Sequence, residues 1–267
     1  MGKSRKYTAL FKAYLESQLE YRANSALWAL IEMLSLASTI ILWLAVYRSR
    51  ESVGNYSLQQ IIAYYALIPL ISSLTYVHVS SILPKQIKDG HISLQLLKPY
   101  SVATAQLVGS ISLQITKQLS KLPVFLICVG GVFKSIQVTL NLGDIALALL
   151  ICLGSFGLHF LIDICISYSA FWLDDVWALS HLKMLVLMVF GGMSFPLDLA
   201  PQKLQPIFNF LPFRFVYAFP IAAAQGRLSP DQLLTGAAQI ILWSLFFWQL
   251  SRILWRRGLR RYEAYGN

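Results

Sequence analysis

Hydrophobic residues along this chain gather in about six runs that are long enough to cross a lipid bilayer. The runs cover residues 26–47, 58–83, 113–133, 145–173, 176–195 and 233–255. A helix needs about 20 mostly apolar residues to span the hydrocarbon core, because each residue advances it by about 1.5 Å. The first run holds one charged residue, Glu32, and the last holds only Arg252. The pattern predicts an all-α integral membrane protein with six transmembrane helices in a single domain.

Proline and aspartate residues indicate where some of these runs begin and end. Pro84 is expected to end the second run, which also contains Pro69, and Asp144 is expected to cap the start of the fourth. The stretch 196–231 is apolar but broken by Pro196, Pro201, Pro206, Pro212 and Pro220. We expect short outer helices and turns there, between spans five and six, with re-entry into the membrane as an alternative where protein buries the backbone.

The N-terminal residues 7–23 have the periodicity of an amphipathic helix. Their apolar side chains recur at helical spacing and form one face: Tyr7, Leu10, Phe11, Tyr14 and Leu15. Aromatic and basic residues in such a segment favour an interface helix that lies flat among the lipid headgroups before the first span. The alternative is an ordinary helix packed on the rest of the protein.

Composition supports a membrane protein, and the charges predict its orientation. Hydrophobic residues make up 57% of the chain and charged residues 13%, so the net charge of +10 is better explained by basic membrane flanks than by nucleic acid. With six spans both termini lie on one side, which then holds 16 of the 22 Lys and Arg residues. That side is predicted to be cytoplasmic. The 16 are Lys3, Arg5, Lys6, Lys12, Arg22, Lys85, Lys88, Lys98, Lys117, Lys121, Lys183, Arg252, Arg256, Arg257, Arg260 and Arg261.

The sequence offers no catalytic or metal-binding motif. Gly2-Lys3-Ser4 resembles the end of a phosphate-binding loop but lacks the upstream glycine and the flanking strand. The motifs HExxH, CxxC and GxSxG are absent, and Cys128, Cys152 and Cys165 sit in apolar segments without paired spacing. We therefore interpret the cysteines as small buried residues, and any ATP-driven activity needs a separate ATPase.

A polar face runs along the fourth predicted span. Ser155, His159, Asp163 and Ser167 recur every four residues, so a helix places them on one side. His159 and Asp163 are spaced to pair with each other. Glu32 is a further polar residue, about a turn and a half into the first span. These residues either line the pathway of a substrate or join helices in a packing seam.

The segment 84–99 is a charged loop bracketed by prolines, long enough for a short helix. Its core is Lys85, Gln86, Ile87, Lys88, Asp89, Gly90 and His91. We expect the charged side chains to be exposed, and Ile87, Ile92, Leu94, Leu96 and Leu97 to anchor the loop. Such a surface suits a soluble partner, and a solvated connector is the alternative.

Several segments resemble one family. They are IKDGHISLQLLKP (87–99), AFWLDDVWAL (170–179), GGMSFPLDLAPQKLQ (191–205), LPF (211–213) and LWRRGLRRYEAYGN (254–267). In this order they are similar to the six-span permease subunits of type-2 ATP-binding-cassette (ABC) exporters. The resemblance covers essentially the whole chain, and the closing segment from Gly258 to Gly266 is its most specific part.

This resemblance implies a permease without catalytic residues of its own, in a bacterial inner (plasma) membrane. It implies a second, identical or related permease and two soluble ABC ATPase subunits that bind the ATP and Mg. The loop 84–99 would be the ATPase-coupling segment, and 7–23 the interface helix. The segment 196–231, with Gly191, Gly192, Pro196, Pro201 and Pro212, would form the outer gate.

Two other classes remain as alternatives. A membrane-embedded enzyme or scaffold would need convergent catalytic groups, and His159, Asp163 and Glu32 supply few. An ion-coupled secondary transporter would usually show internal repeats and interrupted spans in matching halves, which the sequence does not show.

Overall fold

The computed structural model describes residues 3–19, 22–135 and 141–262, and in them the chain is helical, without strands. Outside this description lie residues 20–21 of the predicted interface helix, the Cys128 side chain, and residues 263–267 of the closing motif. The long helices are α1 (Lys3–Leu19), α2 (Arg22–Val46), α3 (Leu58–Thr75), α6 (Val102–Ser135), α7 (Leu142–Tyr168), α8 (Trp177–Phe190) and α11 (Pro230–Arg261). The all-α prediction is confirmed.

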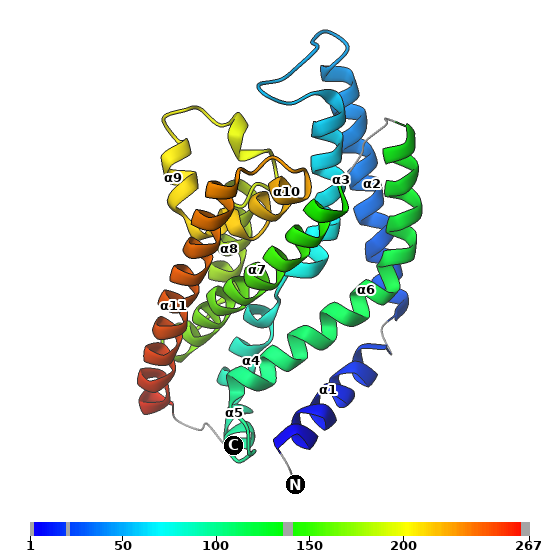
Figure 1. Cartoon of the computed structure of the whole chain (residues 1–267). Helices are drawn as coiled ribbons and strands as arrows, with labels where there is room; N and C mark the ends of the chain where they lie inside the picture. Colours follow the sequence, from blue (N-terminus) through cyan, green and yellow to red (C-terminus); the bar gives the residue numbers. More distant parts are fainter. Residues whose placement is uncertain (1–2, 20–21, 136–140, 263–267) are drawn as a thin grey trace.

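Short helices fill the connections at the two ends of the bundle (Figure 1). At one end, η1 (Val79–Ser81), α4 (Leu83–Lys88) and α5 (Ile92–Leu96) follow α3. η2 (Ser169–Phe171) joins α7 to α8. At the opposite end, η3 (Leu197–Leu199), α9 (Gln205–Phe210), η4 (Pro212–Phe215) and α10 (Ala218–Ala224) connect α8 to α11.

Four of the described helices are long and apolar enough to cross a membrane: α2 from Leu27, α3, α7 extended through η2, and α11. The Val102–Thr116 part of α6 and α8 are shorter apolar helices. At 14 residues, α8 is about 21 Å long, less than the bilayer core of about 30 Å. The chain is thus a multi-pass membrane protein. The four long helices alone do not give the six spans predicted from the sequence.

The second predicted run does not form one helix. α3 ends at Thr75, the chain continues through a non-helical link and η1, and α4 starts a new helix at Leu83. Pro84 lies in the first turn of α4 and therefore opens a helix instead of ending one. The predicted N-cap Asp144 is also wrong, because Asn141 accepts the capping bond from the Gly143 N–H at 3.0 Å.

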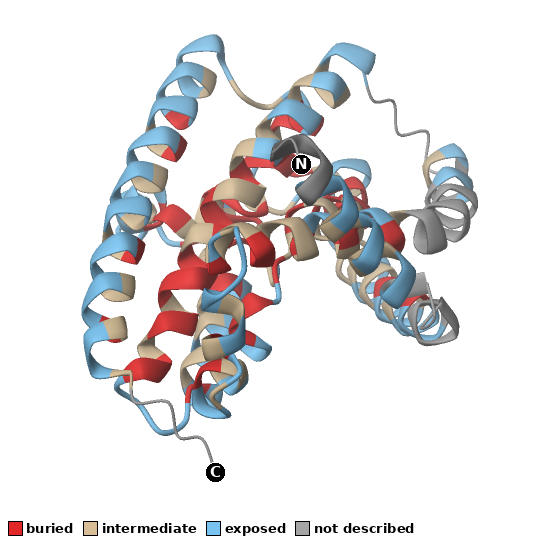
Figure 2. Ribbon diagram, turned by 90° about the horizontal axis from the view of Figure 1, so that it is seen from below, coloured by how far each residue is buried: buried red, intermediate tan, exposed pale blue. Residues whose placement is uncertain are grey.

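Buried residues gather at the centre of the bundle, and the outward faces of the long helices are exposed (Figure 2). One core cluster joins α3, α7 and α10 through residues that include Tyr64, Ile71 and Ile221. A second joins η1, α4, α7 and η2. Exposed apolar residues such as Leu34, Leu153 and Leu242 cover the outside. This distribution is that of a protein whose surroundings are apolar.

α1 packs along α6, and Figure 1 shows the two helices side by side. Gly109 on α6 makes this approach possible, since a Cβ there would lie 3.3 Å from the ring of Tyr14. Of the predicted apolar face, Leu10, Phe11, Tyr14 and Leu15 are half-buried, whereas Tyr7 is exposed. The predicted interface helix is therefore also a packed helix of the protein.

Candidate coupling segment, polar seam and outer segment

The predicted coupling segment folds mainly into two short helices, α4 and α5. α4 and α5 are separated by Gly90, whose φ of +75° is a backbone conformation that glycine adopts without strain. Lys85, Lys88, Asp89 and His91 are exposed, as expected, while Gln86 is half-buried. The segment lies at the same end of the bundle as the start of α1 and the end of α11 (Figure 1).

Polar contacts tie the coupling segment to three other parts of the chain. Lys88 forms an ion pair with Asp174, just before α8, at 3.0 Å. The side-chain amide of Gln106 on α6 donates to Gln86 Oε1 at 3.1 Å. Ser93 Oγ lies 3.1 Å from the hydroxyl of Tyr262, which belongs to the closing segment of the sequence resemblance. A displacement of this segment would therefore reach α6, the α7–α8 junction and α11 together.

Only part of the expected apolar anchoring is observed. Ile87 and Ile92 are buried at 3% and 0% exposure and hold the two helices on the bundle. Leu94, Leu96 and Leu97 do not anchor the loop, because 65%, 46% and 83% of their surfaces are exposed. This part of the prediction is wrong. The three leucines, which we call the leucine patch, instead leave apolar surface exposed in and just after α5.

The polar face of α7 lies inside the protein. Ser155, His159, Asp163 and Ser167 are all fully buried. Ser155 donates to the carbonyl of Phe215 in η4 at 2.5 Å, and Ser167 donates to the Asp163 carbonyl at 2.7 Å. His159 Nδ1 lies 2.8 Å from the Thr75 carbonyl, so Nδ1 carries the hydrogen. Glu32 is on α2, which packs against α3 and α6.

Asp163 pairs with Lys183 on α8, and the expected pair with His159 is not formed. The Lys183 side chain is 9% exposed and that of Asp163 is 0% exposed. The same carboxylate accepts the Ser80 N–H at 2.8 Å, and Lys183 also donates to Ser80 Oγ at 3.2 Å. Lys183 was counted among the bases of the predicted cytoplasmic side, although it falls within the fifth predicted run. The structure places it in α8, which starts at Trp177 and carries this side chain into the bundle.

The break between α3 and α4 is held by side chains from three helices. The Thr75 carbonyl accepts from His159 on α7, and the Tyr76 carbonyl accepts from Gln114 on α6. The Ser80 carbonyl accepts from Ser180 on α8 at 3.1 Å. Backbone groups without helical partners are costly in an apolar environment unless protein satisfies them. We call this set of contacts the polar seam; it stabilises an interrupted helix.

The outer segment 196–231 is fastened to α3 and to the turn that follows α8, which contains Gly191 and Gly192. Gly192 has a φ of +84°, and a Cβ there would lie 2.7 Å from both Ala218 Cβ and Tyr64 Oη. Tyr64 donates to the Gly192 carbonyl at 2.5 Å, and the Gly191 carbonyl accepts from the Ala218 N–H at 2.9 Å. Pro196 precedes η3, Pro201 opens the turn before α9, and Pro212 starts η4.

A second contact fastens the outer segment to the α2–α3 connection. Tyr56 donates to Asp198 Oδ2 at 3.1 Å, and the Arg227 guanidinium lies 3.7 Å from the centre of the Tyr56 ring. Burial, followed by the neighbouring Asp198 carboxylate, raises the pKa of the Tyr56 hydroxyl. The hydroxyl therefore stays protonated and remains a donor to Asp198.

Comparison with known proteins identifies the family. The family model described as "ABC-2 family transporter protein" matches residues 33–266. The chain belongs to the ABC-2 transporter family. No curated protein and no solved structure matches it. This ABC-2 protein is therefore a membrane-spanning permease subunit of an ABC transporter, a component of a transport complex that includes an ATPase.

Sequence reasoning missed the partners of the ABC-2 permease's polar groups. Ser180 and Lys183 lie in an apolar run that is typical of a membrane span, and Gln114 is a polar residue at the start of another such run. One signal was present: Ser180 and Lys183 are three residues apart and thus share a helical face. Within the described residues, no group of His, Cys, Asp or Glu could hold a metal ion.

Proposed function

We propose that this permease, paired with a second identical or related copy, forms the substrate pathway of an exporter that two separate soluble ATPases drive. The observation that carries the proposal is the coupling segment. It exposes charged and apolar side chains at one end of the bundle and is bonded through Gln86, Lys88 and Ser93 to α6, Asp174 and Tyr262. ATP and Mg would be bound by the partner ATPases.

The orientation follows from charge. The end that carries α4 and α5 also holds the basic run Arg256, Arg257, Arg260 and Arg261 at the end of α11. Lys and Arg are retained on the cytoplasmic side of membranes. We place this end and both termini in the cytoplasm, α9 and α10 outside, and the protein in the plasma membrane with α6 and α8 completing six spans.

The polar face of α7 acts in this proposal as structure and not as a substrate lining. Its four side chains are fully buried in one copy. Three of them, Ser155, His159 and Asp163, bond to Phe215, Thr75, Ser80 and Lys183. Through these bonds, α7 links the outer segment to the break between α3 and α4. A pathway between two copies would be lined by surfaces that a single copy leaves exposed.

The test is reconstitution of the full chain with a candidate soluble ATPase. The chain alone should not hydrolyse ATP, and the two proteins should co-purify with two copies of each. In vesicles, the complex should expel substrate and be stimulated by it in a screen of lipids, peptides and drugs. Robust hydrolysis by the chain alone, with contaminants excluded, would contradict the proposal. An ATPase made inactive by substitution serves as the control.

A further inference from the structure

A cavity of about 300 Å³ lies between α1 and the end of the coupling segment. Its eight lining residues come from α1, from α5, from the link that follows α5 and from the first turn of α6. They are Leu10, Ala13, Tyr14, Ser17, Gln95, Lys98, Tyr100 and Ala105. The cavity is separate from the polar seam and from the patch formed by Leu94, Leu96 and Leu97.

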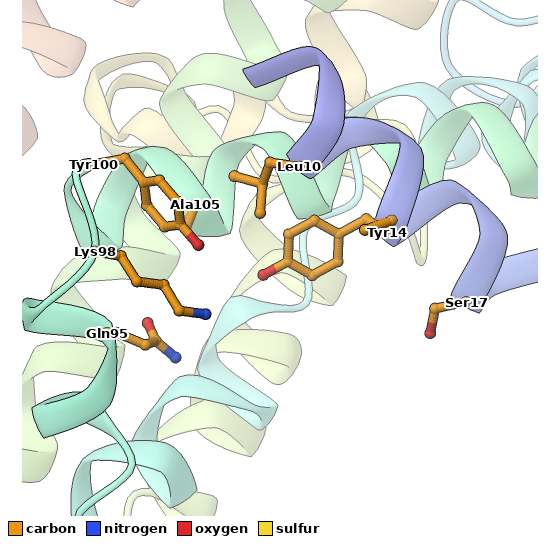
Figure 3. A pocket seen from close by; sticks show the side chains of 8 residues that line it. Leu10, Tyr14, Ser17, Gln95, Lys98, Tyr100 and Ala105 are labelled. Atoms are coloured by element: carbon orange, nitrogen blue, oxygen red, sulfur yellow. The ribbon is translucent and has the colours of Figure 1, made fainter. Parts of the chain in front are cut away.

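Polar groups converge in this cavity (Figure 3). The hydroxyls of Tyr14 and Tyr100, the amine of Lys98 and the amide of Gln95 point into a common space. Lys98 Nζ lies 6.0 Å from the centre of the Tyr100 ring. Burial, and then the neighbouring Tyr100 hydroxyl, raise the pKa of Tyr14, so its hydroxyl remains a neutral donor at physiological pH. The lining contains no carboxylate.

The chemistry of this set selects an anion. One fixed positive charge with two phenolic donors suits the oxygens of a phosphate group, and charge-assisted hydrogen bonds of this kind are the strong ones. The lining also includes three apolar side chains, those of Leu10, Ala13 and Ala105. A group that is charged at one end and apolar at the other matches this mixed lining.

We propose that this cavity binds the phosphate headgroup of an anionic phospholipid of the cytoplasmic leaflet. The cavity lies beside α1, which the sequence predicts to be an interface helix at the depth of the lipid headgroups. Basic pockets between membrane helices on the cytoplasmic side are known binding sites for such headgroups. The bound lipid would connect α1 with Gln95 and Lys98 and so hold the coupling segment against α6.

This inference rests on the membrane location and on the proposed orientation, but not on the substrate or on export. The probes are dioctanoyl phosphatidylglycerol and dioctanoyl phosphatidylcholine, added to the full chain in neutral detergent, with bound lipid measured by native mass spectrometry. Phosphatidylglycerol should bind at least about tenfold more tightly than phosphatidylcholine. Inorganic phosphate at millimolar concentration should not displace it. Equal binding of the two lipids, or displacement by free phosphate, would overturn the proposal.

Variants locate the site. Lys98→Ala should weaken phosphatidylglycerol binding by about tenfold, the order expected for one charge-assisted hydrogen bond. The matched control is Lys12→Ala on α1, whose side chain is 75% exposed and lies outside the cavity; it should bind like the unmodified chain. Tyr14→Phe with Tyr100→Phe, which preserves packing, should weaken binding several-fold. Unchanged binding in Lys98→Ala and in the double Phe variant, or equal weakening by Lys12→Ala, would refute the site.

Discussion

Lys183 on α8 donates to the carboxylate of Asp163 on α7, and the protein buries both side chains. Ser80, from η1 between α3 and α4, contributes its N–H and its hydroxyl to the same pair. Three segments far apart in the sequence thus meet at one ion pair. A buried charge is costly without its partner. The pair therefore fixes how the break between α3 and α4 packs against α7 and α8.

Removing the lysine alone should destabilise the protein strongly. Lys183→Met leaves the Asp163 carboxylate buried without its partner, at an expected cost of about 3–5 kcal/mol. Lys183→Met with Asp163→Asn should recover much of this loss, because the amide oxygen can still accept the Ser80 N–H. Thermal unfolding of the purified protein in detergent measures both. The control is Lys203→Met, at an exposed position of the outer segment, and a loss in the single variant no larger than in this control would contradict the buried pair.

The outer segment should be sensitive at Gly192. A side chain there must adopt a φ of +84° and would meet Ala218 and Tyr64 at 2.7 Å. Gly192→Ala is expected to cost at least about 1–2 kcal/mol from the backbone conformation alone. Gly157→Ala on α7 is the matched control, since nothing lies within 4 Å of its added Cβ; it should be neutral or slightly stabilising. Equal unfolding temperatures for the two variants would show that the turn at Gly192 is not constrained as described.

The sequence was sufficient for the long helices but not for how their polar groups pair. Apolar runs predict helices directly, because a bilayer requires backbone groups to be satisfied within the segment. The same rule did not predict the break after Thr75. There the backbone carbonyls are satisfied by His159, Gln114 and Ser180 from other helices. Spacing along α7 correctly placed its four polar residues on one face. It could not show that Asp163 meets Lys183, a contact that depends on how α8 packs.

The coupling segment illustrates a second limit. Its charges and bracketing prolines predicted an exposed loop, and its exposed charges are where they were expected. Leucines in a polar loop are ordinarily taken as anchors, yet only the isoleucines at 87 and 92 are buried. Periodicity cannot separate apolar residues that a chain buries from those that it leaves exposed. The three-dimensional positions of Leu94, Leu96 and Leu97 were needed for that distinction.

The orientation can be tested by cysteine labelling in intact cells. With the native cysteines replaced, Gln202→Cys in the outer segment should react with an impermeant maleimide, and Asp89→Cys in the coupling segment should react only after the membrane is opened. Both positions are exposed in the structure, so access to the side chain itself is not limiting. Labelling of Asp89→Cys in intact cells would reverse the orientation inferred from the basic residues.

The Lys88–Asp174 ion pair can be separated from a contact with the ATPase by charge exchange. Lys88→Glu places two carboxylates together and should lower coupled ATPase activity while the protein still inserts in the membrane. Lys88→Glu with Asp174→Lys restores an opposite pair at the 3.0 Å contact. Recovery of activity in the exchanged variant would show that the pair acts within the permease. If the exchange does not restore activity, Lys88 acts through a contact other than the ion pair with Asp174, such as a contact with the ATPase.

The leucine patch gives the sharpest test of docking. Leu94→Asp with Leu97→Asp introduces two charges where 65% and 83% of the leucine surfaces are exposed, so the fold of the permease should not change. Association with the ATPase should weaken by at least about tenfold, since each 1.4 kcal/mol of lost apolar contact is a factor of ten. The matched control is Leu204→Asp with Ile207→Asp, the same kind of change at 44% and 51% exposure near α9 in the outer segment; it should leave association intact. Co-purification and ATPase activity of equally expressed variants decide the matter: full association of the Leu94 and Leu97 variant would mean that this segment is a connector and that the ATPase docks elsewhere.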